Sequence, residues 1–289
     1  GADWRPGVSV SAQPDALSMM AHQNIDALKA LFKISSVNLQ VGETHVSRDL
    51  GFEVFPGEMT AILGRNGVGK STLLSCLAGL PRGVMTGDIL LGNKTYAQWG
   101  DRAAACWRGW LAQKQQDQFG ATVLETVISG RHPHLNRWAW ESSDDQALAM
   151  ASLRAVGMDG FAERDVLTLS GGERQRVAVA TILTQNPSLY FMDEPLAHLD
   201  LNHQIEVLEL MRIKARKERV SCIMVLHEPG LAHRYCDSAL LLFGEGEWQY
   251  GSVSTVLTAE NLSRLYGYPL VQIERADANG QMQRWFVPA

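Results

Sequence analysis

The segment from Gly64 to Ser71 constrains this chain more than any other part of its sequence. It fits the pattern G-x-x-x-x-G-K-[ST], follows the apolar run Met59–Leu63 and precedes a stretch, Ser71–Leu77, whose apolar spacing is helical. A loop of this kind curls its backbone N–H groups round a phosphate, and the helix behind it points its positive end at the same group. The pattern predicts a strand, a phosphate-binding loop and a helix. A glycine turn without a ligand is the alternative.

The lysine and the serine of this loop indicate a nucleoside triphosphate with a metal ion. Lys70 is expected to neutralise β- and γ-phosphate oxygens, and the Ser71 hydroxyl to hold Mg²⁺, which prefers oxygen ligands. We therefore expect ATP and Mg²⁺ as cofactors. The expected nucleotide-binding residues are Gly64, Arg65, Asn66, Gly67, Val68, Gly69, Lys70, Ser71 and Thr72.

Composition excludes several other classes of protein. An apolar fraction of 46% over 289 residues can fill a large core, and a net charge of −5 argues against nucleic acid as a partner. The four cysteines are far apart, so their spacing suggests neither zinc nor a redox pair, and reduced thiols in the cytosol are expected. No apolar run approaches the roughly 18 to 20 residues that cross a bilayer, and the N-terminus is unlike a secretory signal. Any membrane role is expected to be peripheral.

The order of apolar patterns predicts an α/β fold. Runs at 32–41 and 50–54 are expected to form antiparallel strands in a small edge sheet, and further strands are expected at 188–192, 221–226 and 238–243. Helical stretches such as 204–216 separate these later strands, which implies a mainly parallel sheet. Residues of about 114–165 are expected to form an inserted helical subdomain.

The two ends of the chain are expected to lie outside the main domain. Residues 1–21 have no periodicity and are interpreted as a flexible leader or a remnant of cloning. Residues 269–289 are expected to be an extension that packs on the core, with a helix at 262–266 before it and a last strand at 285–287.

The run Leu169-Ser170-Gly171-Gly172-Glu173-Arg174-Gln175-Arg176 resembles the LSGGQ-type signature of ABC ATPases. On physical grounds alone, a serine and two glycines that open a helix offer N–H groups and a hydroxyl to an anion, although an ordinary helix cap is the simpler reading. The resemblance covers about 33–268. It implies the P-loop NTPase fold of an ABC cassette and a head-to-tail homodimer, in which Ser170, Gly171, Gly172 and Glu173 close over the nucleotide of the partner.

The same resemblance assigns roles to further residues. Leu189–Asp193 resembles a Walker B strand, which implies that Asp193 holds Mg²⁺ and that Glu194 is the general base for the attacking water. Gln113 matches the glutamine that contacts Mg²⁺ or that water, His227 matches the switch histidine on the γ-phosphate, and Leu199 and Asp200 match the D-loop at the dimer interface.

The sequence departs from this family at the adenine end of the pocket. ABC ATPases usually have an aromatic side chain that stacks on adenine, and our alignment places Val41 or its neighbours there. His45 or the leader could substitute. The phosphate loop is still expected to supply the affinity.

The run Gly130-Arg131-His132-Pro133-His134-Leu135 resembles a segment of the ATPases of metal-chelate importers, which carry ferric siderophores, haem or cobalamin. This implies two permease subunits that contact the helical subdomain at the cytoplasmic face of the inner membrane, and indirectly a periplasmic or lipid-anchored binding protein. A polar loop, or a metal site formed by the two histidines, is the alternative. Some of Trp99, Trp107, Trp110, Trp138 and Trp140 are expected to contact the permease.

Two other functions remain as alternatives. Soluble ABC ATPases of DNA repair or translation share the signature, but only 100 residues separate Lys70 from Ser170, which leaves room for no more than a helical insert. A non-hydrolysing adaptor would use ATP only to dimerise, and Glu194 and His227 argue against it.

Overall fold

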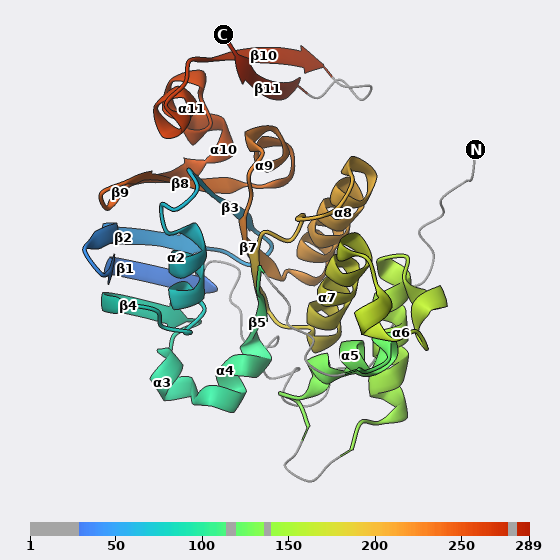
Figure 1. Ribbon diagram of the computed structural model, residues 1–289. Helices are drawn as coiled ribbons and strands as arrows, with labels where there is room; N and C mark the ends of the chain where they lie inside the picture. The colour runs from blue at the N-terminus through green and yellow to red at the C-terminus, as the bar shows by residue number, and fades with distance from the viewer. Residues whose placement is uncertain (1–28, 114–119, 136–139, 277–281) are drawn as a thin grey trace.

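The computed structural model describes residues 29–113, 120–135, 140–276 and 282–289, and a six-stranded sheet lies at its centre (Figure 1). The strand order is β5-β6-β7-β3-β8-β9, and every neighbouring pair is parallel except β8 with β9. The expected mainly parallel sheet is confirmed, whereas the leader proposed at residues 1–21 lies outside the described residues. The strands are β3 (Met59–Gly64), β5 (Arg108–Leu111), β6 (Leu189–Asp193), β7 (Ser221–Val225), β8 (Ser238–Gly244) and β9 (Glu247–Ser252).

Strand β6 shows why these runs are apolar without alternation. Every residue of it is buried: Leu189 and Phe191 contribute to the core on one face of the sheet, and Tyr190 and Met192 to the core on the other. Parallel strands covered on both faces need apolar side chains at successive positions. This packing fixes the end of β6, whose last residue is Asp193 and which is followed by Glu194.

One face of the central sheet is covered by helix α2 (Lys70–Leu77) and by a separate antiparallel sheet of order β2-β1-β4. Strands β1 (Phe32–Val41) and β2 (Thr44–Val54) were expected, but β4 (Val84–Leu91) was not. Gly87 has a φ of 96° in the middle of β4, and a Cβ there would lie 2.4 Å from the Ser36 carbonyl oxygen. The irregular pairing of β1 with β4 requires this glycine. Because glycine is uncommon inside strands, its presence hides the strand in the sequence.

The other face of the central sheet is covered mainly by helices, which Figure 1 shows beside β5 and β7. Helices α5 and α6 belong to the stretch expected to be an inserted helical subdomain, and α7, which begins at the signature, packs against both. The helices of this layer are α5 (Val123–Ile128), α6 (Ser143–Ala155), α7 (Gly171–Gln185), α8 (Leu201–Glu218) and α9 (Pro229–Tyr235), with short 3₁₀ turns η1 (Ser129–Arg131), η2 (Asp159–Phe161) and η3 (Val166–Thr168).

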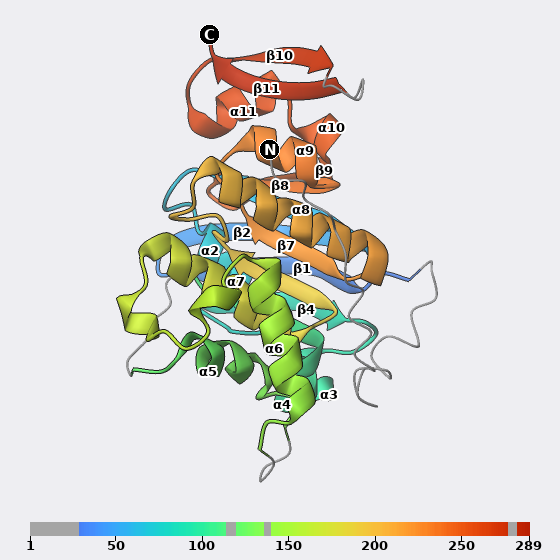
Figure 2. The same cartoon turned by 90° about the vertical axis from the view of Figure 1, so that its right-hand side faces the viewer.

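The chain ends in a hairpin of β10 (Leu270–Ala276) and β11 (Met282–Pro288), which lies beyond α10 (Val253–Val256) and α11 (Ala259–Tyr266) (Figure 2). Leu270 and Phe286 pack against the core on the helical face of the central sheet. Two short helices, α3 (Tyr96–Trp99) and α4 (Asp101–Trp107), lead into β5. Within the described part of the chain, no helix combines the length and the apolar character that crossing a bilayer requires.

Candidate functional site

The loop between β3 and α2 has the backbone that phosphate binding requires. Gly67 and Gly69 have φ values of 81° and 101°, which other residues rarely adopt. A Cβ at Gly69 would also lie 2.7 Å from both methyl groups of Val46, so the loop is packed tightly against β2. No described side chain caps the N-terminus of α2, and its backbone N–H groups remain available to an anion.

Lys70 lies across this loop. Its ammonium group is buried and donates to the carbonyl oxygens of Gly64, at 2.8 Å, and Arg65, at 3.1 Å. Burial lowers the pKa of Lys70, and the nearby carboxylates of Glu194 and Asp193 oppose this shift. The cation is thus held beside the loop, where it can neutralise phosphate oxygens.

Ser71 and Asp193 meet at the end of β6. The Ser71 hydroxyl donates to Oδ1 of Asp193 at 2.9 Å, although the two residues are far apart in the chain. Asp193 is buried, and this burial raises the pKa of its carboxyl group, while the hydrogen bond from Ser71 lowers it. A buried carboxylate beside a hydroxyl offers oxygen ligands to a hard cation.

Glu194 has an unusual backbone conformation. Its φ is 51°, in the left-handed region that residues other than glycine seldom occupy. The buried side chain of Gln175, on α7, supports this turn by donating to the carbonyl oxygens of Pro195, at 3.0 Å, and Glu194, at 3.4 Å. Gln175 cannot be recognised as a site residue from the sequence, because the partner of its amide is a turn that lies about 20 residues further along the chain.

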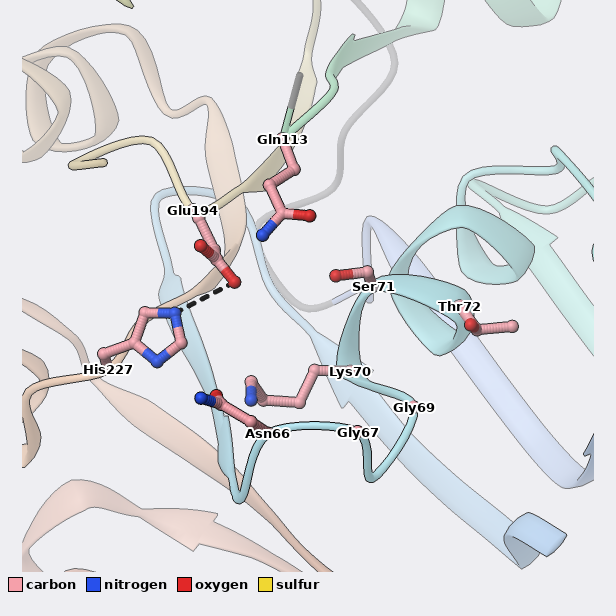
Figure 3. A pocket seen from close by; sticks show the side chains of 9 residues that line it. All are labelled: Asn66, Gly67, Gly69, Lys70, Ser71, Thr72, Gln113, Glu194 and His227. Carbon is pink, nitrogen blue, oxygen red and sulfur yellow. Dashed lines mark ion pairs between the residues drawn. The ribbon is translucent and has the colours of Figure 1, made fainter. Parts of the chain in front are cut away.

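The carboxylate of Glu194 faces His227 and Gln113 (Figure 3). Nε2 of His227 lies 2.9 Å from Oε1 of Glu194. Burial raises the pKa of Glu194, but hydrogen bonds from Gln113 and His227 and the charge of Lys70 outweigh it, and the pKa is lowered overall. The group is therefore an ionised acceptor at neutral pH, as a base that polarises water needs to be.

These residues surround one cavity of about 430 Å³. Figure 3 shows Glu194, His227 and Gln113 on one side of it, and the loop with Lys70 and Ser71 on the other. A cavity of this size takes a small ligand such as a nucleotide phosphate chain. Its lining residues are Asn66, Gly67, Gly69, Lys70, Ser71, Thr72, Gln113, Glu194 and His227.

The signature segment lies elsewhere on the molecule. Ser170 is the N-cap of α7: its hydroxyl accepts from the Glu173 N–H at 3.3 Å, and the Glu173 carboxylate accepts from the Ser170 N–H at 2.7 Å. Ser170 and Gly171 are exposed, and neither they nor Gly172 nor Glu173 belong to the lining of the cavity. The helix cap is confirmed, and the N-terminus of α7 is exposed.

The D-loop residues pack against this segment. A Cβ at Gly172 would lie 2.9 Å from the carbonyl oxygen of His198 and 3.8 Å from Leu199. Asp200 caps α8, and its carboxylate accepts from the backbone N–H of His203 at 3.0 Å. The signature and the D-loop therefore form one surface.

The segment Gly130–Leu135 is tied to the far end of α7. His134 donates from Nε2 to the carbonyl oxygen of Gln185 at 2.9 Å, and the Arg131 guanidinium pairs with Asp145 of α6 at 2.7 Å. A Cβ at Gly130 would lie 2.3 Å from the Thr181 carbonyl oxygen, so only glycine fits. The segment therefore connects α6 to α7. Its partners Asp145 and Gln185 were not predicted from the sequence.

The tryptophans between residues 99 and 140 differ in how far they are buried. Trp99 and Trp107 lie with ring centroids 5.2 Å apart, and both pack with Trp110 against the core between the two sheets. Trp140 is 89% exposed, and Trp138 lies outside the described residues. Of the four described tryptophans between residues 99 and 140, Trp140 alone is exposed.

The adenine end of the pocket has no aromatic side chain in the expected place. Val41 ends β1 and is exposed, and His45 is partly exposed at the start of β2. Neither residue lines the cavity. The role of His45 as a substitute stays a prediction.

Comparison with known proteins agrees with this geometry. Residues 47–197, just over half of the chain, match the family model described as ABC transporter. The chain is 37% identical to the hemin import ATP-binding protein HmuV of Burkholderia ambifaria over 84% of this chain and 96% of that protein. It is 41% identical to the petrobactin import ATP-binding protein FpuD of Bacillus anthracis over 71% and 75% of the two chains.

A solved structure supports the fold over nearly the whole chain. A transporter assigned to the metal-chelate type, in an inward-facing conformation, superposes with a TM-score of 0.78 at 28% identity and covers 90% of this chain and 98% of its own. This confirms the expected ABC cassette. The chain belongs to the ABC transporter family, as an ATP-binding subunit that hydrolyses ATP.

Proposed function

We propose that this chain powers a membrane importer of a metal chelate and that Glu194 is the general base of its ATPase reaction. One observation carries the proposal: the ionised carboxylate of Glu194, paired with His227, lies in the same cavity as Lys70 and Ser71. The relatives named for hemin and petrobactin import support the class of cargo.

The site fits a Mg²⁺ ion. Ser71, Asp193 and the amide oxygen of Gln113 would supply the oxygen ligands that this cation prefers, and the hydrogen bond of 2.9 Å between Ser71 and Asp193 already brings two of them together. When bound, the ion would neutralise charge on the β- and γ-phosphates.

Side chains and backbone N–H groups of this chain would perform the remaining steps of hydrolysis. Lys70 and the N–H groups at the start of α2 hold the phosphates, and Glu194 orients and polarises a water for in-line attack on the γ-phosphorus. His227 fixes the Glu194 carboxylate and can donate to the γ-phosphate. A non-hydrolysing adaptor would have no use for this pair.

A head-to-tail homodimer completes the site in this proposal. Residues Ser170 to Glu173 present an exposed, capped helix N-terminus that lies outside the cavity of their own subunit. In a second copy the same segment would close over the γ-phosphate. Leu199, which packs beside Gly172, would follow together with the adjacent Asp200.

The membrane partner is assigned to the helical side of the molecule. Two permease subunits would contact the region of Arg131–Leu135 and the exposed Trp140 from the cytoplasmic face of the inner membrane. A periplasmic or lipid-anchored binding protein would act through these permeases without touching this chain.

Reconstitution tests the proposal. The chain is purified with its membrane partner, placed in liposomes, and assayed for ATP hydrolysis with hemin, a ferric siderophore, cobalamin, a sugar or an amino acid, each with its binding protein. We expect one of the three chelates to stimulate hydrolysis. Stimulation by the sugar or the amino acid alone would overturn the chelate assignment while leaving the ATPase intact.

A further inference from the structure

The far end of the signature helix is fastened to the strand that leads to the cavity. The side-chain amide of Gln185, the last residue of α7, donates from Nε2 to the carbonyl oxygen of Ala105, at 2.6 Å, and to that of Arg108, at 2.8 Å. Ala105 lies in α4 and Arg108 begins β5, so one amide holds the junction of the two elements. The bond to Arg108 has an ordinary donor–acceptor distance, and the bond to Ala105 is slightly shorter than usual.

Strand β5 passes this constraint to Gln113. Only four residues separate Arg108 from Gln113, and the first three of them continue β5, whose carboxyl end lies beside that of β6. Gln113 lines the same cavity as Glu194, and its side-chain amide contributes to the lowered pKa of the Glu194 carboxyl group (Figure 3). We therefore expect a shift of Arg108 relative to α7 to move Gln113 relative to Glu194, because Gln113 follows the end of β5 by two residues.

The interface between β5 and α7 has little room to adjust. A Cβ at Gly109 would lie 2.8 Å from Cγ1 of Ile182 on α7 and 2.8 Å from Cγ of Pro187. The backbone carbonyl of Gln185 also accepts from His134, so the segment Gly130–Leu135 is attached to the same residue. The end of α7 thus receives contacts from two sides.

We propose that Gln185 is a positioning residue for the ATPase reaction: its amide holds β5 against the end of the signature helix, and this contact places Gln113 at the Glu194 carboxylate. This inference rests on the proposed role of Glu194. It adds a residue that no part of the phosphate loop, the signature or the switch includes. It also explains why the amide end of Gln185 faces two carbonyl groups and not solvent.

The test uses the full-length chain and the isosteric substitution Gln185→Met, which keeps the volume and removes both donors. We expect kcat to fall about tenfold or more, since small misplacements of a positioning group cost up to about 100-fold, with ATP affinity in calorimetry and KM within about twofold of the parent. Gln146→Met, at an exposed position on α6, is the matched control and should change neither value.

A double-mutant cycle with Gln113→Ala separates positioning from a general loss of structure. If Gln185 acts through Gln113, Gln185→Met should lower kcat in the parent and have almost no further effect beside Gln113→Ala. Equal fold losses in both backgrounds, or an unchanged kcat for Gln185→Met, would overturn the inference.

Gly109→Ala provides a second route if Gln185→Met unfolds. The added methyl group separates β5 from α7 without altering Gln185, and it should give the same loss of kcat with unchanged ATP affinity. An unchanged kcat for this variant contradicts the inference as well. The proposed function fails differently: a parent protein whose hydrolysis survives Glu194→Gln refutes the general base, whatever Gln185→Met does.

Discussion

His227 and Glu194 form a pair at the edge of the cavity, with Nε2 of the imidazole 2.9 Å from Oε1 of the carboxylate. The two residues follow neighbouring parallel strands, β7 and β6, whose carboxyl ends meet at one edge of the sheet. Ligands of open α/β sheets bind at this edge. The pair fixes the direction of the carboxylate before any nucleotide binds.

Replacement of Glu194 by glutamine tests the general base. The amide keeps the shape of the side chain but cannot accept a proton, so we expect Mg-ATP turnover to fall by at least about 100-fold, at the lower end of what a general base contributes. Calorimetry should show ATP binding unchanged. With hydrolysis blocked, size-exclusion chromatography should show an ATP-dependent dimer. Phosphate release at the parental rate would contradict the role of Glu194.

Removal of the Lys70 ammonium group tests the phosphate loop. Lys70→Ala loses the cation that neutralises the β- and γ-phosphates, and we expect ATP affinity to drop by at least about 100-fold, the loss of a charge-assisted contact with its ligand partner left unpaired. Lys33→Ala is the control, because Lys33 is an exposed lysine that pairs with Glu53 and does not line the cavity. Parental ATP affinity in Lys70→Ala would refute the assigned function of the loop.

The sequence predicted those parts of the site that are encoded locally. Two such parts are the loop from Gly64 to Ser71 and the strand that ends at Asp193, and each is one continuous segment. The glycines of the loop indicate phosphate binding, and the apolar run of the strand indicates a buried position in the sheet. Contacts between distant segments were not predictable in this way. Gln185 bonds to Ala105 and Arg108, about 80 residues away, and nothing in the local pattern around Gln185 distinguishes it from a surface glutamine.

Two features of the backbone were also not predictable from the sequence. Glu194 has a φ of 51° in the turn after β6, and Gln175 of α7 donates hydrogen bonds to the carbonyl oxygens of this turn. Strand β4 was missed because its pairing with β1 requires Gly87, a residue that argues against a strand when read alone. In both cases tertiary packing overrides the preference of the local sequence.

The signature glycines provide a test of the dimer. Gly172→Ala places a methyl group 2.9 Å from the His198 carbonyl oxygen and should displace the segment from the D-loop. We expect ATP binding to a single subunit to persist, while ATP-dependent dimerisation, measured in the Glu194→Gln background, is lost. Gly160→Ala, where the added Cβ meets nothing within 4 Å, is the matched control and should leave the dimer intact. A dimer of parental affinity in Gly172→Ala would argue against the signature as part of the interface.

The pair of Arg131 and Asp145 makes a prediction about stability and pH. Burial alone would raise the pKa of Asp145, but hydrogen bonds from Ser142 and Arg131 lower it overall, below the ordinary value of 3.8. Because the folded-state pKa lies below that of the unfolded chain, the ionised carboxylate stabilises the fold above pH 3.8, and this contribution disappears as the pH falls through the folded-state pKa.

Asp145→Asn should therefore reduce the free energy of unfolding by about 1.5–3 kcal/mol at pH 7, the range for hydrogen bonds to charged groups. Urea unfolding from pH 7 downward checks the sign: the difference between parent and variant should stay constant down to about pH 4 and shrink only at more acid pH. Asp144→Asn, at an exposed position in the same turn of α6, is the control for charge at the helix N-terminus and should cost well under about 1 kcal/mol. A difference that grows as the pH falls would mean that Asp145 stabilises the fold in its protonated form and would refute the ion pair.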